Sequence, residues 1–293
     1  MTYPRRWPRP HDRTPALPEP IAPGRGVLRA VRRGPRTIIE RAYASSPLRL
    51  LTPRNHGNAA WVYTSSFGGG LVDGDAVSLD VDVDRDASLF VSTQASTKVY
   101  RSTHGSSARL TVRVADRGLL VLAPDPVVCF AESRFEQHQT FDVASDGRLV
   151  VIDWVTSGRR ESGERWAFTQ YVNRLVMRLD DTLIVHEALA LRRQDGDLAA
   201  RLGRFDVLAV VVVLGAALAA RAAAVVQQFA AEPVERRAAE LRVATPLVHP
   251  RLGTVGCLVR IAGRSVEDVG RTIRSCLQFV PDLLGDDPWA RKW

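Results

Sequence analysis

Apolar and polar residues alternate along much of the chain after residue 26. The segment 77–84, VSLDVDVD, has a valine or leucine at every second position, with serine or aspartate between them. The segment 109–114, RLTVRV, alternates in the same way. A period of two places the apolar side chains on one face of a β-strand. Further short runs of this kind, separated by Asp-Gly turns at 146–147 and 195–196, predict a mainly β fold.

Two stretches in the last third of the chain have a helical pattern instead. Residues 216–231 are rich in alanine and poor in β-branched residues, a composition that favours a helix. Residues 265–280 begin with Ser265 as a candidate N-cap and carry Asp268 at the third helical position. Apolar residues then follow at helical spacing. We therefore expect about two α-helices in the C-terminal third, and we find no sequence repeat of fixed period.

An uncharged apolar run, VLAVVVVLGAALAA, occupies residues 207–220 and resembles part of a membrane span. It is only 14 residues long and Arg221 follows it. A helix that crosses a bilayer needs about 20 apolar residues, whereas shorter runs are typical of a buried core. We therefore expect this run inside the protein, and no membrane partner.

The formal net charge of +8 is concentrated in the N-terminal segment. Residues 1–41 contain ten arginines and three acidic residues, so the remainder of the chain is close to neutral. Residues 1–25 also hold seven of the 17 prolines and little to bury. This composition predicts a disordered Pro/Arg-rich arm at 1–25 and one β domain at 26–293. A basic tail on a neutral body is a weak indication of nucleic-acid binding, and we expect no such partner.

The glycine-rich stretch SSFGGGLVDGD, at 65–75, raises the possibility of a phosphate-binding loop. Gly69 and Gly74 have the spacing of a P-loop, but Asp75 stands where the phosphate-binding lysine is required. A carboxylate at that position would repel a phosphate. The aspartates of the segment 80–86 also fail as a calcium loop, because Arg85 replaces the glycine of the sixth position. We expect these glycines to allow tight turns or close strand packing.

Motifs for covalent catalysis or tight metal binding are missing from the sequence. The three cysteines, Cys129, Cys257 and Cys276, have no paired spacing, which fits a reducing cytosol and small core residues. The six histidines form no i, i+4 pair, so a structural zinc site is disfavoured. No Gly-x-Ser-x-Gly elbow is present. These absences favour a binding or scaffold role over an enzyme.

The segment 67–102 resembles the signature region of the UreD (UreH) family of urease accessory proteins. That family has a Gly-Gly-x-x-x-Gly-Asp block, an alternating strand, and then a Thr-Thr-Gln-x-x-Thr-Lys-x-Tyr-Arg block, which here reads STQASTKVYR at 92–101. Four further blocks occur in the family's order, and together they extend the resemblance over about residues 26–293: APDPVVCFAESRF at 123–135, GRRESGERWAF at 158–168, HEALAL at 186–191 and LLGDDPWARKW at 283–293.

The resemblance implies a single elongated domain of stacked sheets, similar to a β-helix, with two helices. It implies a cytoplasmic scaffold without catalytic activity. Such a scaffold binds apo-urease and recruits UreF and the GTPase UreG, and the complex inserts nickel into the urease active site with GTP hydrolysis. GTP belongs to UreG, so no nucleotide or other permanently bound cofactor is expected here. We expect the segment 216–231 and the C-terminal segment to offer apolar docking faces to UreF.

The resemblance also implies an internal passage for Ni²⁺ in transit. Carboxylate and hydroxyl ligands on inward-facing strands would bind such an ion weakly enough to release it. Asp153 and Glu187 are the strongest candidates. Three other candidates have a simpler structural role as an alternative: Asp75 as a cap of the glycine turn, Thr97 as a strand residue, and Glu161 as the partner of Arg159. The full set of passage candidates is Asp75, Ser96, Thr97, Asp153, Glu161 and Glu187.

Two other functions fit a β protein of this kind. A stand-alone nickel-binding metallochaperone would bind the metal tightly without partners, but the scattered histidines and unpaired cysteines speak against tight binding. A β-fold enzyme would gather its catalytic residues from distant strands, and the missing nucleophile motif speaks against that reading.

Overall fold

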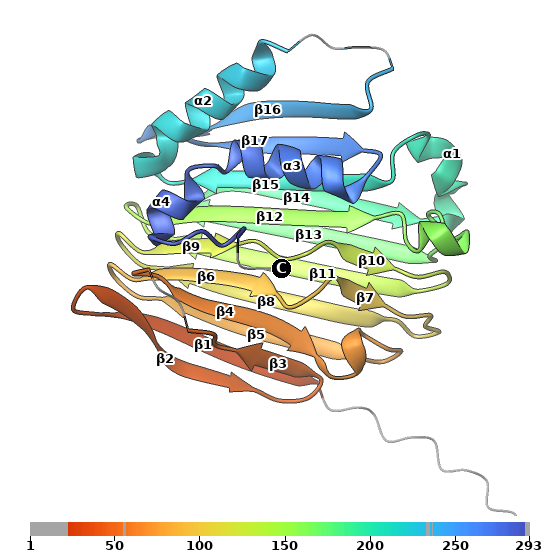
Figure 1. Ribbon diagram of the computed structural model, residues 1–293, viewed down its shortest axis with the longest axis horizontal. Coiled ribbons are helices and arrows are strands. Elements are labelled where there is room, and N and C mark those ends of the chain that lie inside the picture. The colour runs from red at the N-terminus through yellow and green to blue at the C-terminus, as the bar shows by residue number, and fades with distance from the viewer. Residues whose placement is uncertain (1–22, 55–56, 233–234, 236, 291–293) are drawn as a thin grey trace, which may run out of the picture.

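The computed structural model describes residues 23–54, 57–232, 235 and 237–290 (Figure 1). Most of the expected N-terminal arm, residues 1–22, lies outside the described residues. The first strand, β1, begins at Gly24. Strands dominate the fold, and they form two mixed sheets, neither of which closes on itself.

The first sheet, called sheet A here, has seven strands. Their order in space is β14 (Thr182–Arg192), β13 (Gln170–Leu179), β11 (Arg134–Val143), β8 (Ser106–Val114), β5 (Ala76–Val83), β1 (Gly24–Arg33) and β2 (Arg36–Ala44). The alternating segments of the sequence analysis are β5 and β8, so both strand predictions are confirmed.

The second sheet, sheet B, has ten strands. Eight of them follow the order β16 (Glu240–His249), β17 (Gly253–Gly263), β15 (Val207–Leu214), β12 (Arg148–Thr156), β9 (Leu119–Leu122), β6 (Ser88–Thr93), β4 (Ala60–Ser66) and β3 (Leu48–Leu51). Beside β12 lies the short strand β10 (Val127–Cys129), and β7 (Thr97–Val99) pairs with β10.

The chain coils between the two sheets in the manner of a β-helix. Strands β5, β8, β11 and β13 pair in parallel in sheet A, and β4, β6, β9 and β12 do so in sheet B. Antiparallel hairpins end the coil on both sides. The prediction of a mainly β domain of stacked, β-helix-like sheets is therefore confirmed.

A repeated corner holds successive turns of this coil together. Arg117 donates from Nε and Nη2 to the two carboxylate oxygens of Asp86 at 2.6 and 2.7 Å, and the two residues are 31 positions apart in the sequence. Arg85 and Asp116, also 31 apart, form a second such contact at 3.1 Å. Related Asp-containing corners occur at 84–88, 115–119 and 144–148, at spacings of 31 and 29 residues, which do not amount to a repeat of fixed period.

The described residues contain four α-helices: α1 (Leu198–Leu202), α2 (Ala219–Ala230), α3 (Val266–Cys276) and α4 (Val280–Leu284). Three of them, α2, α3 and α4, cover the outer face of sheet B, and α1 lies at one end of the coil (Figure 1). Helices α2 and α3 confirm the two predicted helices. Ser265 caps α3 as expected, because its Oγ accepts a hydrogen bond from the backbone N–H of Asp268 at 3.1 Å. The short helices α1 and α4 were not predicted.

The apolar run that begins at residue 207 is buried, as predicted. Its first eight residues form β15 in the middle of sheet B, where Val211 faces the helices and Val212 faces sheet A. In the described part of the chain, no helix is both long and apolar enough to cross a membrane.

Helix α2 was expected to offer an apolar docking face. Its residues Ala222, Val225 and Phe229 are buried against sheet B. The exposed side presents Gln227 and Gln228 together with alanines such as Ala224. The larger apolar side chains therefore pack in the core, and docking of a partner on the exposed side stays a prediction.

Candidate functional site

A stripe of polar side chains crosses the space between the two sheets. On β12 the inward-facing residues are Val151, Asp153 and Val155, so a carboxylate stands between two apolar residues of different core clusters. The neighbouring strands repeat this order. On β11, Gln137 and Gln139 lie between Phe135 and Phe141. On β13, Asn173 lies between Tyr171 and Leu175.

The register of the strands explains why these polar residues align. Gln137 pairs with Asn173 in sheet A, and Thr64 pairs with Thr93 in sheet B. Residues paired across neighbouring strands share a face of the sheet. The polar positions therefore line up across the strands, between one apolar cluster and the other.

Two cavities lie along this stripe. The first cavity, about 220 Å³, is lined by residues from β3 to β12, and the second, about 320 Å³, lies among β12 to β15 and β17. Asp153 and Trp154 line both cavities. The buried carboxylate of Asp153 thus stands where the two cavities adjoin.

Amide side chains surround the Asp153 carboxylate. Gln137 donates from Nε2 to Oδ1 of Asp153 at 3.1 Å, and Asn173 donates from Nδ2 to the other oxygen. Gln139 donates to Oδ1 of Asn173 at 3.4 Å. No arginine or lysine takes part in this cluster of described residues, so neutral donors alone stabilise the charge.

Burial raises the pKa of Asp153 to about 6, although the hydrogen bonds from Asn173, Gln139 and Gln137 lower it. Loss of hydration disfavours the charged form of a carboxyl group, and neutral amide donors compensate only in part. Asp153 can therefore gain or lose a proton close to neutral pH. A cation nearby would favour the ionised form.

Glu187, the second strong candidate, lines the second cavity from β14. Its carboxylate forms an ion pair with Arg260 on β17, and Arg260 Nε lies 3.2 Å from Oε2. Its side chain is 25% exposed and that of Arg260 is 48% exposed. The pair joins the two sheets at the open edge of the sandwich. Glu187 is thus neutralised by a cationic partner, whereas Asp153 is not.

Ser96 and Thr97, the two hydroxyl candidates, line the first cavity. Asp125 and Thr93 line it as well, and the Thr93 hydroxyl donates to Oδ2 of Asp125 at 3.3 Å. The wall of this cavity therefore carries carboxylate, hydroxyl and amide oxygens. Oxygen donors of this kind suit hard or borderline divalent cations.

Asp75 is buried but is not part of either cavity wall. Its Oδ2 accepts a hydrogen bond from the backbone N–H of Val72 at 2.8 Å. This contact closes the glycine-rich turn, which is the structural alternative that the sequence offered. The structure does not bring Asp75 together with Asp153.

The glycine-rich stretch packs closely against the block at 92–101. A Cβ added at Gly70 would lie 2.5 Å from the Tyr100 ring and 2.7 Å from the carbonyl oxygen of Lys98. Leu71 then donates to the same carbonyl oxygen at 2.8 Å. Close backbone approach therefore explains the glycine at 70, in agreement with the prediction that this is not a phosphate loop.

Glu161 lies in an exposed turn of 3₁₀-helix, Arg160–Ser162, away from both cavities. Its proposed partner Arg159 pairs with Glu164 instead, with Nε 3.0 Å from Oε2. Glu164 also accepts a hydrogen bond from the backbone N–H of Ala131 at 3.0 Å. The pairing of Glu161 with Arg159 is therefore wrong, because Glu164 can reach both Arg159 and the neighbouring loop.

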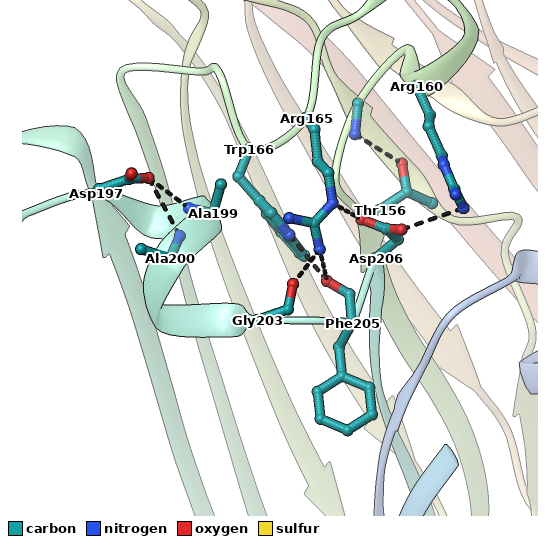
Figure 2. A network of polar contacts seen from close by, with 11 residues as sticks. Thr156, Arg160, Arg165, Trp166, Asp197, Ala199, Ala200, Gly203, Phe205 and Asp206 are labelled. Carbon is teal, nitrogen blue, oxygen red and sulfur yellow. Dashed lines mark hydrogen bonds and ion pairs between the residues drawn. The ribbon is translucent and has the colours of Figure 1, made fainter. Parts of the chain in front are cut away.

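Figure 2 shows how the rest of this loop is held, with Arg160 and Arg165 both directed at Asp206. Asp206 is buried, and Arg160 Nη1 lies 3.3 Å from its Oδ2. Trp166 donates from Nε1 to the carbonyl oxygen of Phe205 at 2.9 Å. These contacts join the 158–168 block to the segment before β15. The block thus serves the architecture at this end of the coil.

The structure therefore brings four of the six sequence candidates to the cavities. Ser96, Thr97 and Asp153 line the first cavity, and Asp153 and Glu187 line the second. Sequence reasoning missed many other polar wall residues, among them Asp125, Gln137, Gln139, Asn173 and Arg260. A polar residue between apolar ones at alternate positions, as at 135–141, was the available signal.

Among the described residues, no three His, Cys, Asp or Glu side chains gather closely enough to hold a metal ion as a group. The carboxylates of Asp125, Asp153 and Glu187 are instead distributed along the two cavities.

Comparison with known proteins identifies close relatives across the whole described fold. The model of the family described as UreD urease accessory protein matches residues 22–293. A urease accessory protein UreD of Sorangium cellulosum (strain So ce56) is 48% identical over 270 residues, which cover 92% of this chain and 84% of that protein. A UreD of Anaeromyxobacter sp. (strain Fw109-5) is 43% identical over 250 residues, covering 85% of this chain and 82% of that protein. Urease accessory protein D of Arabidopsis thaliana is 30% identical over 296 residues, covering 92% of this chain and all of that protein.

Proposed function

The chain belongs to the UreD family of urease accessory proteins, and from this membership we propose that it is a urease maturation factor without catalytic activity of its own. Its role is to bind apo-urease in the cytoplasm and to recruit UreF and the GTPase UreG. The assembled complex then inserts nickel into the urease active site at the expense of GTP bound to UreG. The family name supports a role alongside urease and other accessory proteins.

The proposed contribution of this chain to nickel transfer is an internal route for the ion. Nickel is cargo here and not a resident cofactor. The observation that carries this proposal is the position of Asp153, a buried carboxylate that lines both cavities and has only neutral donors around it. A buried charge without a cationic partner is costly, so a transient cation would stabilise the ionised form.

Ligand exchange along the cavities would move the ion. In the first cavity, Ni²⁺ would keep part of its water shell and contact the hydroxyls of Ser96 and Thr97. It would then bind Asp153, whose proton would leave to water. Glu187 would receive the ion in the second cavity, once its ion pair with Arg260 opens. Separate single carboxylates, in place of a closed cage, would favour release over retention.

The direct test is nickel-dependent activation of apo-urease in a reconstituted mixture with UreF, UreG and GTP. We expect activation to require this chain, and to fall at least about tenfold for Asp153→Asn while the complex still elutes as one species. A tenfold change corresponds to about 1.4 kcal/mol. Asp75→Asn is the matched control, since Asp75 is equally buried but lies outside the cavity walls.

Four outcomes would contradict the proposal. Activation that proceeds without the chain would remove the maturation role. Full activation by Asp153→Asn would remove the internal route while leaving the scaffold. Tight binding of nickel to the isolated chain, measured by calorimetry, would favour the stand-alone metallochaperone instead. Turnover of a substrate by the pure chain would point to an enzyme.

A further inference from the structure

The outer face of sheet A carries a row of basic side chains, called the basic row here. Arg109 on β8, His138 on β11 and Arg174 on β13 are in register across three neighbouring parallel strands. Neighbouring strands lie about 4.8 Å apart, so the row runs straight across the sheet and the Cα atoms of its two arginines are about 10 Å apart. Both arginines are exposed, on the side of the molecule opposite to the helices of sheet B (Figure 1).

The side chains of the basic row point away from the space between the sheets. Arg109 adjoins the first cavity, but Ala108 and Leu110 on either side of it pack inward, so the arginine side chain points outward. The amide side chains of β11 and β13 that bind Asp153 face inward, which places His138 and Arg174 on the outer face as well. A ligand bound to the row would therefore lie outside the sandwich.

The basic row has no acidic partner of its own. In the part of the chain that the structure describes, its three side chains form no ion pair and no hydrogen bond. Like charges that face each other directly on neighbouring strands are destabilising. An external anion would relieve this repulsion.

A second row, four residues further along the same three strands, shows the compensated arrangement. Arg113, Asp142 and Arg178 are in register there. Arg178 Nη1 lies 3.6 Å from Oδ1 of Asp142, and Arg113 Nη1 lies 3.9 Å from Oδ1 of Asp82. An aspartate in the middle thus gives an ion-paired row, whereas His138 in the middle leaves the first row open to a partner.

Two carboxylates restrict the width of that partner. Asp80 on β5 lies beyond one side of the basic row, and Glu136 on β11 lies beyond the other side, both on the outer face of the sheet. Their charges would repel a broad polyanion such as a nucleic-acid duplex. A narrow acidic element that lies along the row avoids both.

The spacing of the row matches the acidic face of an α-helix. Residues i, i+3 and i+7 share one face of a helix and lie at about 0, 4.5 and 10.5 Å along its axis. The row has its side chains at about 0, 5 and 10 Å. Alternate residues of an extended strand are about 6.7 Å apart, so a strand laid along the row would fall out of step with it.

We propose that the basic row of Arg109, His138 and Arg174 is a docking surface for a helix of a partner protein, with carboxylates at positions i, i+3 and i+7. The outer carboxylates bind the two arginines, and the middle one accepts a hydrogen bond from His138. The helix lies across the strands of sheet A. This surface goes beyond the proposed function, and its test needs neither nickel nor urease, so it can fail while the ion route stands.

The test uses the full chain and a labelled alanine-rich peptide of about 20 residues, which is long enough to be helical. The peptide carries glutamate at i, i+3 and i+7. We expect binding at or below about 1 mM in about 0.15 M salt, measured by fluorescence anisotropy. An isomer with glutamate at i, i+5 and i+10, spread around the helix, should bind at least about fivefold more weakly. Since both peptides have the same charge, their comparison removes the general electrostatic attraction.

Matched substitutions in the chain test the location. Arg109→Gln should weaken the binding of the first peptide about threefold, and its combination with Arg174→Gln about tenfold, in the range of exposed ion pairs. Arg113→Gln removes a charge about 13 Å away on the same strand. It should leave the affinity within about twofold, because that distance exceeds the Debye length of about 8 Å at this salt concentration.

Absence of binding by the wild-type chain would overturn the proposal. Equal affinity for the two peptide isomers would do so as well, because it would reveal a general attraction without a matched helix face. Equal weakening by Arg109→Gln and Arg113→Gln would place the peptide elsewhere. A DNA duplex that binds more tightly than the peptide, and loses affinity in Arg109→Gln, would assign the row to nucleic acid and contradict the proposed occupant.

Discussion

Gln137 on β11 donates a hydrogen bond of 3.1 Å to the carboxylate of Asp153 on β12, across the space between the two sheets. The two residues are 16 positions apart, and each lies between apolar neighbours of its own strand. The contact therefore joins the sheets at a point where the apolar core is interrupted. Its energetic consequence depends on whether Asp153 carries a charge.

Asp153 makes the stability of the protein depend on pH. Its folded pKa of about 6 is above the ordinary value of 3.8, so its protonated form is favoured by folding. The resulting stability is complete below about pH 4 and is lost as the pH rises through 6. We expect the free energy of unfolding of the wild type, relative to Asp153→Asn, to fall by on the order of 3 kcal/mol over that range.

Chemical denaturation of both proteins at a series of pH values from 4 to 7 measures this difference. Subtracting the variant removes the contributions of all other groups, since they are common to both proteins. A difference that stays flat from pH 4 to 7 would mean that the Asp153 carboxyl is hydrated in solution, in contradiction to its burial here.

Local patterns predicted much of the fold. The strict alternation of 77–83 became β5, and Ser265 caps α3 as the spacing to Asp268 indicated. The alternation alone did not predict the coil, because successive turns are joined by corners such as Asp86 and Arg117. These corners occupy few positions in each turn, and the strands between them accept many residues with the same alternation.

The site was less accessible to sequence reasoning. The sequence pointed to Asp153 as a candidate but not to Gln137 or Asn173 as its partners. These contacts depend on how β11, β12 and β13 face one another, which follows from the register of two different sheets. The exposed Glu161 and the partly buried Glu164 illustrate the same limit, since both are glutamates in one loop and only the fold separates their roles.

The glycine-rich loop gives a prediction about steric space. At Gly70 the backbone is extended, but a Cβ would collide with the carbonyl oxygen of Lys98 and the ring of Tyr100. We expect Gly70→Ala to lower the free energy of unfolding by about 2–3 kcal/mol, as overpacking does. Gly68→Ala should cost only about 1 kcal/mol, because its φ of 79° is unfavourable for alanine but nothing lies within 4 Å. Urea denaturation of the two variants decides the order, and a larger cost at Gly68 would contradict the packing seen here.

The three cysteines should be inert in the folded protein. Burial raises the pKa of Cys129 to about 12, that of Cys276 to about 12 and that of Cys257 to about 11. Because the thiolate is the reactive form, a thiol reagent at pH 8 should modify none of them on the time scale of minutes, and all three once the protein is denatured. Mass spectrometry after timed labelling counts the modified residues. Rapid labelling of any cysteine in the native protein would show that its strand or helix opens readily.

The loop at 158–166 provides a test that separates architecture from ion transfer. Asp206 is buried and binds both Arg160 and Arg165, so Asp206→Asn should lower the free energy of unfolding by about 2 kcal/mol. The side chains of both arginines are partly exposed, so solvent screening limits the loss of stability. Glu161→Ala, in the same loop, should change stability by less than about 0.5 kcal/mol, since its side chain is exposed. In the urease activation assay, Glu161→Ala should match the wild type. Reduced activation by Glu161→Ala at unchanged stability and assembly would return this residue to the candidate route and would place part of that route on the outside of the protein.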